Sequence, residues 1–124
     1  MSDALRNTPV RGARDLPGGF EYIGTVDPCT VWANRIGDRW CRVIHLEDAS
    51  EHGSTVFVGD LDLLRWWRVL AWRRRYLGLP ADDPVWSENV LILALYETHL
   101  IDQIAWNWFA TKTDAIAWAL ECAA

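Results

Sequence analysis

The chain has 124 residues, of which 51% are hydrophobic and 23% charged, and its formal net charge is −5. This length fits one domain, and the composition excludes a disordered chain. An acidic total argues against general binding to nucleic acids or anionic membranes, because both need a positive surface on the protein.

The most unusual feature of the composition is the tryptophan content. Nine residues are tryptophan, at positions 32, 40, 66, 67, 72, 86, 106, 108 and 118. Each ring can bury roughly 150–250 Å² of surface. The sequence therefore predicts either a very aromatic core or a surface that meets a partner.

Residues 1–19 are rich in glycine and proline and show no apolar periodicity. We expect a flexible arm here, followed by a single domain over residues 20–124. The arm lacks the apolar stretch of a signal peptide, and the longest apolar run, residues 90–96, is too short to cross a bilayer. We expect a cytoplasmic protein, and the three widely spaced cysteines match no zinc-ligand pattern, so we expect no metal and no cofactor.

Residues 20–58 have the composition of strands, and we expect an antiparallel meander of about four strands there, over residues 20–26, 30–36, 39–47 and 55–58. Gly37 and Asp38 predict a two-residue hairpin turn. In that register Arg35 lies opposite Trp40, where the two side chains can form a cation–π contact, and Trp32 lies opposite Val43. Trp32 and Trp40 then fall on opposite faces of the hairpin.

The apolar period changes to that of a helix after the meander. Asp60 is a candidate N-cap for a helix over residues 60–77, which Gly78 and Pro80 end. Residues 85–124 contain no glycine or proline, so we favour a second helix over residues 85–110; the alternative makes residues 90–96 and 104–110 buried strands.

Residues 111–114 resemble a capping box that opens a last helix ending at Ala123. The sequence therefore predicts an α+β fold, in which a small antiparallel β-meander is followed by three helices packed on one face of the sheet.

The first candidate site is the outer face of the helix predicted over residues 60–77. Alternating guanidinium and aromatic groups on one helix face suit a carboxylate-bearing protein surface or phosphate, while the structural alternative is a solvated face with its aromatic groups on another helix. Trp106 joins the set because it leans to the polar side of its own predicted helix. The partner-binding candidates are Arg65, Arg68, Trp72, Arg75, Tyr76 and Trp106.

A second candidate is a pair of charges placed within apolar stripes. Arg74 lies in the stripe of the first predicted helix and Glu97 in that of the second. Antiparallel packing of these helices would join them as a buried ion pair; the alternative is a lone Glu97 with a raised pKa that acts as an acid or base. Cys41 and His45 are too far apart along one strand, roughly 13 Å, to form a catalytic pair, and Cys41 is expected to be an inert core thiol.

No catalytic set of residues is recognisable, and three functional hypotheses follow. The first is a non-enzymatic protein–protein interaction or accessory protein, such as a bacterium or a mobile element encodes, which self-associates through Trp/Arg-rich surfaces. The second is a small-molecule-binding domain or small enzyme with a Trp-lined apolar pocket. The third and weakest is nucleic-acid binding through the arginine-rich helix at residues 60–77.

Overall fold

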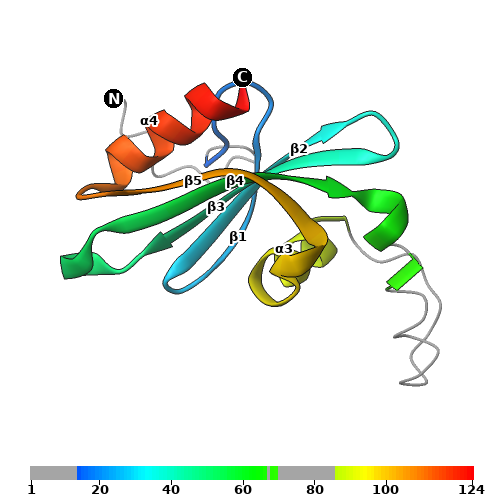
Figure 1. Cartoon of the computed structure of the whole chain (residues 1–124), viewed down its shortest axis with the longest axis horizontal. Coiled ribbons are helices and arrows are strands. Elements are labelled where there is room, and N and C mark those ends of the chain that lie inside the picture. Colours follow the sequence, from blue (N-terminus) through cyan, green and yellow to red (C-terminus); the bar gives the residue numbers. More distant parts are fainter. Residues whose placement is uncertain (1–13, 67, 70–85) are drawn as a thin grey trace.

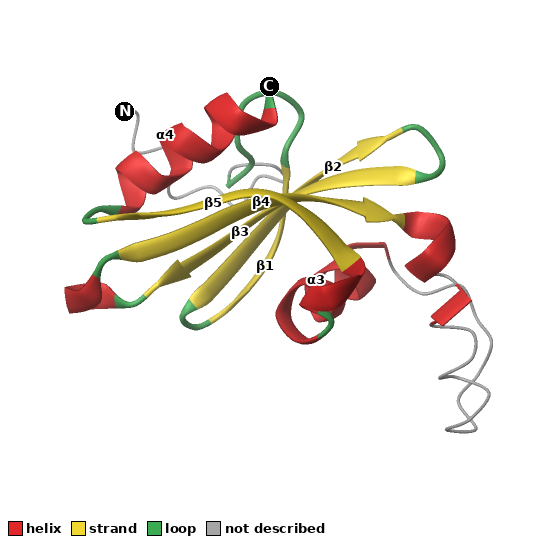
Figure 2. Ribbon diagram, viewed as in Figure 1, coloured by secondary structure: helices red, strands yellow, loops and turns green. Residues whose placement is uncertain are grey.

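The computed structural model describes residues 14–66, 68–69 and 86–124. Its centre is one antiparallel sheet of five strands in the order β1-β2-β3-β4-β5, so that each strand pairs with its neighbour in the chain (Figure 2). The strands are β1 (Glu21–Val26), β2 (Cys29–Ile36), β3 (Trp40–Asp48), β4 (Ser54–Asp62) and β5 (Ile101–Phe109).

Two longer helices accompany the sheet, α3 (Trp86–Tyr96) and α4 (Lys112–Ala123). Short 3-10 helices, η1 (Ser50–His52) and η2 (Thr98–Leu100), precede β4 and β5, and residues 63–66 and 68–69 are helical. The α+β class is therefore confirmed, but the sheet has five strands rather than about four.

The two helices lie on opposite faces of the sheet (Figure 1). We call these the α3 face and the α4 face. The core is accordingly divided in two: one cluster holds Val43 and Leu61 with Val90 and Leu93 of α3, and the other holds Ile44 and Val56 with residues of α4. The expectation of three helices on one face is wrong, because β3 and β4 are apolar at both odd and even positions and each face needs a cover.

Residues 85–110 do not form one helix. The chain is helical to Tyr96, turns through η2 and continues as β5, so neither alternative from the sequence is right throughout. The predicted strand over residues 104–110 overlaps β5, whereas residues 90–96 are helical. Gly59 makes room for β5, since a Cβ there would lie 2.5 Å from Ile101 Cγ2.

The hairpin between β2 and β3 is shifted by one residue from its predicted register. Ile36 pairs with Trp40, Arg35 with Cys41 and Trp32 with Ile44. The turn thus has three residues, and it is Arg39, not Arg35, that lies over the Trp40 ring, at 5.6 Å from its centroid. Because a one-residue slip exchanges the faces of a strand, Trp32 and Trp40 belong to the same face rather than to opposite ones.

The helix after β4 begins later than predicted, because β4 extends to Asp62. The Asp62 carboxylate accepts hydrogen bonds from the amides of Leu64 and Arg65, which makes Asp62 the capping residue in place of Asp60. At the last helix the predicted cap is confirmed, since Thr111 accepts a hydrogen bond from the Asp114 amide and α4 follows.

Asp60 has a different role, which is to join α4 to the sheet. The Arg42 guanidinium donates to both Asp60 carboxylate oxygens at 2.9 and 3.1 Å, and it also donates to the Ala123 carbonyl at the end of α4. A cation beside the last carbonyl groups of a helix also interacts favourably with the helix dipole.

The part of the N-terminal segment that the structure describes packs against β1 and β2. Trp32 is buried and its indole N–H donates to the Arg14 carbonyl at 3.0 Å. Leu16 forms a β-bridge with Phe20, and the Asp15 carboxylate accepts a hydrogen bond from the Tyr22 amide. The outer side of β1 is thereby partly protected by the residues that precede it.

Candidate functional site

The most conspicuous surface is a row of aromatic side chains on the α3 face. Strand pairing sets His45 beside Phe57, and Phe57 beside Trp106, so that three neighbouring strands contribute one ring each. Trp108 stands two residues further along β5, opposite Thr55. Residues two apart on a strand share a face, and we call His45, Phe57, Trp106 and Trp108 the aromatic patch.

The patch lies outside the area that α3 covers. Towards η2 the same face is closed, because Cys41, Val43 and Leu61 are completely buried. Towards the other end it opens: Phe57 lies at the margin of the core, Trp106 is 63% exposed and Trp108 is 51% exposed. Among the residues that the structure describes, no helix covers these two rings.

Trp108 is exposed but firmly held. Its indole N–H donates to the His52 carbonyl in the β3–β4 connection, at 2.8 Å. The ring rests on Gly53, where a Cβ would lie 2.6 Å from Trp108 Cζ2 and 2.6 Å from the Phe109 carbonyl oxygen. Gly53 also has a φ of +82°, a conformation that favours glycine. The local structure therefore presents Trp108 in one orientation.

His45 forms the half-buried end of the patch. Its imidazole stacks on the Phe57 ring with 4.7 Å between centroids and 12° between planes. Burial lowers the pKa of His45, and nearby Glu47 opposes this only in part. His45 is thus a neutral, flat ring at neutral pH, and it extends the apolar character of the patch into the sheet.

Sequence reasoning selected one member of this patch and missed the others. Trp106 was expected to be exposed and is, but on an edge strand rather than on a helix. Helical spacing over residues 85–110 places Trp108 on the same apolar stripe as Glu97 and so predicts a core position for it, which is wrong, because Trp108 is 51% exposed. Trp106 and Trp108 are two residues apart with the polar Asn107 between them, and this alternation is the sequence pattern that indicates a strand.

The arginine-rich candidate site is only partly described. Arg65 and Arg68 are exposed on the helical residues after β4. Trp72, Arg75 and Tyr76 lie outside the described residues, so the proposed helix face stays a prediction. Trp106, the sixth candidate, belongs to β5 instead.

The predicted pair of buried charges is likewise half described. Glu97 is buried, as expected, and follows α3 directly; its carboxylate lies 3.5 Å from the His99 imidazole. Arg74 lies outside the described residues. The Arg74–Glu97 ion pair therefore remains a prediction.

Cys41 is fully buried and burial raises its pKa to about 12, so this thiol is inert at neutral pH. Within the described ranges, no three His, Cys, Asp or Glu side chains form a group that could hold a metal ion. In the same ranges no helix is long and apolar enough to span a membrane.

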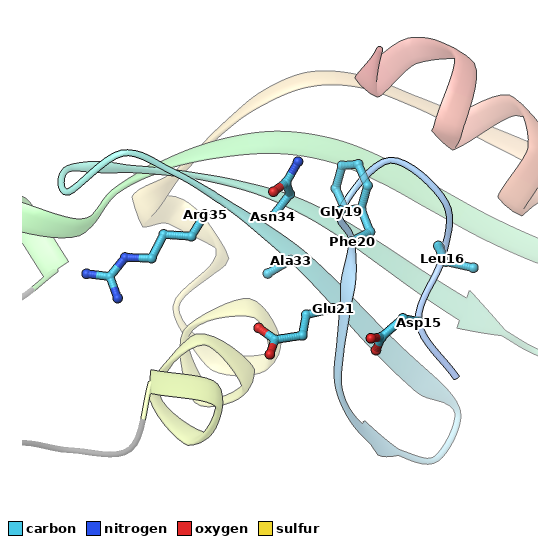
Figure 3. A pocket seen from close by; sticks show the side chains of 8 residues that line it. All are labelled: Asp15, Leu16, Gly19, Phe20, Glu21, Ala33, Asn34 and Arg35. Carbon is cyan, nitrogen blue, oxygen red and sulfur yellow. The ribbon is translucent and has the colours of Figure 1, made fainter. Parts of the chain in front are cut away.

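A cavity of about 300 Å³ lies where the segment before β1 meets β1 and β2. Its charged side chains, Asp15, Glu21 and Arg35, spread apart around it instead of converging on one point (Figure 3). No tryptophan lines it, so it is not the Trp-lined pocket of the small-molecule hypothesis.

Comparison of this chain with protein-family models, with curated proteins and with solved structures found no match.

Proposed function

We propose that this protein is a small accessory protein, without catalytic activity of its own, that binds another protein surface through the aromatic patch. The observation that carries the proposal is the exposure of Trp106 and Trp108, side by side on one face of an edge strand. Tryptophan, with tyrosine and arginine, is enriched among the side chains that dominate binding energy at protein interfaces.

The form of the patch supports binding to a protein rather than to a small ligand. None of the patch residues lines the cavity near β1, whereas small-molecule sites are concave. Trp108 is fixed by its hydrogen bond to His52, and a fixed aromatic side chain loses little conformational entropy on binding. Exposed apolar patches of this kind on a soluble domain generally mark interaction sites.

Charge makes nucleic acid the weaker alternative. The aromatic patch contains no arginine or lysine, and the whole chain carries a net charge of −5. Single-stranded nucleic acids do stack on aromatic side chains, but binding also needs cations along the backbone path. A protein surface with an apolar centre has no such requirement.

The proposal is tested with the tagged full-length chain as bait, in an extract of its native host supplemented with an untagged copy of the chain. The Trp106→Lys variant places a charge in the centre of the patch, and Tyr96→Lys is the matched control, because Tyr96 is a 71% exposed ring on α3 outside the patch. We expect at least one protein to bind wild type and Tyr96→Lys but not Trp106→Lys. If all three baits retain the same proteins, the proposal is wrong.

A further inference from the structure

The outer edge of β5 differs from the outer edge of β1. β5 is the last strand of the sheet, and within the described residues no further strand pairs with it. Its nine residues include one charge, Asp102, and an irregular pairing between Gln103 and Ala105, but neither proline nor lysine, which are two of the usual guards of a sheet edge. At the opposite edge, Asp15 already accepts the hydrogen bond of the Tyr22 amide.

Backbone direction shows which groups the edge of β5 presents. The Trp108 amide donates to the side-chain oxygen of Asn107 at 2.8 Å, so it points away from β4. Amides alternate in direction along an antiparallel strand. The Trp106 amide therefore also faces the open edge, and both exposed rings belong to residues whose backbone can accept a new strand.

We infer that the partner of this edge is a second copy of the chain, whose β5 pairs antiparallel with β5 about a twofold axis at Trp106. This inference rests on the proposed function, since it names the partner of the same surface. Trp106 would face Trp106 of the second copy. The aromatic patch would then continue across the axis into the aromatic patch of the other molecule. The two sheets would form one.

Symmetry and charge favour a second copy over a foreign strand. In this register Ala105 lies opposite Asn107, and Asp102 lies opposite Ala110, so no like charges meet across the axis. Among the described residues, the edge is guarded by Asp102, by the irregular pairing between Gln103 and Ala105, and by the Asn107–Trp108 hydrogen bond. That hydrogen bond is local and is replaced by a bond between strands when the copies pair.

The exposed area fits a reversible dimer. Trp106, Trp108 and Ile104 are each at least half exposed, which leaves roughly 350 Å² of side-chain surface per copy. Pairing of two strand edges leaves the outer faces of these rings in solvent, so both copies together would bury less than about 700 Å² from these side chains. The paired backbones add to this. The total stays below about 1,200 Å², the lower end of standard-size interfaces, so we expect a weak, reversible dimer.

Sedimentation velocity of the full chain over about 1 to 500 μM tests the inference, with circular dichroism to show that each variant is folded. We expect wild type and Tyr96→Lys to dimerise equally and Trp106→Lys to dimerise at least tenfold more weakly. Asn107→Ala removes the competing acceptor of the Trp108 amide, so its dimer should be about 3- to 10-fold tighter.

Two results would overturn the inference. If Asn107→Ala leaves the dissociation constant unchanged, the copies do not pair through the backbone of β5. If wild type stays monomeric over the whole range, a second copy is not the partner; the proposed function then stands when Trp106→Lys still loses a foreign protein from the host extract, and falls with the inference when it loses none.

Discussion

Gly53→Ala tests whether the β3–β4 connection holds Trp108 in place. The added Cβ would lie 2.6 Å from both the Phe109 carbonyl oxygen and Trp108 Cζ2, and the residue would keep a φ of +82°. The left-handed conformation costs an alanine about 1–2 kcal/mol. Overpacking against a strand backbone that cannot move freely costs about 1–3 kcal/mol more, so the free energy of unfolding should fall by about 2–5 kcal/mol.

The matched control is Gly37→Ala in the β2–β3 turn. Gly37 has a φ of +68°, but an added Cβ there meets no atom within 4 Å. Both variants lower the entropy of the unfolded chain equally, so Gly37→Ala isolates the conformational cost of about 1–2 kcal/mol. Urea unfolding followed by circular dichroism measures both variants. Equal losses of stability would refute the packing of Trp108 and Phe109 on Gly53.

Two further predictions concern the sheet and its attached helix. Arg42→Met removes the hydrogen bonds to Asp60 and Ala123. The free energy of unfolding measured in urea should fall by about 1–2 kcal/mol, and amide exchange at the end of α4 should become faster. The control Arg39→Met removes an exposed ion pair with Asp62 and should have a smaller effect. Burial lowers the pKa of His45 in the folded state, so the unfolded chain binds the proton more readily. The contribution of His45 to stability is therefore complete above about pH 6.5, and it is lost as the pH falls towards the folded pKa. Unfolding curves at several pH values should show this dependence of stability on pH in wild type and in the exposed-site control His52→Gln, and a weaker dependence in His45→Phe. An unchanged pH dependence in His45→Phe would contradict a desolvated, neutral imidazole.

The sequence predicts the parts of the fold that short-range chemistry determines. The first three strands follow from runs of β-branched and aromatic residues between turn signals, and the last helix follows from Thr111 and Asp114, whose capping bond needs only neighbouring residues. The register of the first hairpin is wrong by one residue, because Arg39 belongs to the turn and nothing local distinguishes a two-residue from a three-residue connection.

β5 could not be predicted in this way, because its structure depends on a distant strand. The run from Ile101 to Phe109 suits a helix or a strand by composition, and pairing with β4 decides between them. β4 lies about 45 residues earlier in the chain, so no window of neighbouring residues contains the deciding interaction. The wrong helix prediction also affected the site, because a helix over these residues would bury Trp108 whereas the strand exposes it.

The exposure of each tryptophan depends on the strand and the sheet face on which it stands. Trp32 and Trp106 both stand on strands of the same sheet; Trp32 is 5% exposed beside the segment before β1, and Trp106 is 63% exposed. The chain buries Trp32 and Trp66, and α3 packs on the same face as Trp106 without covering it. Among the described residues nothing covers Trp106 and Trp108, and the open strand edge beside them is where the proposed second copy would attach.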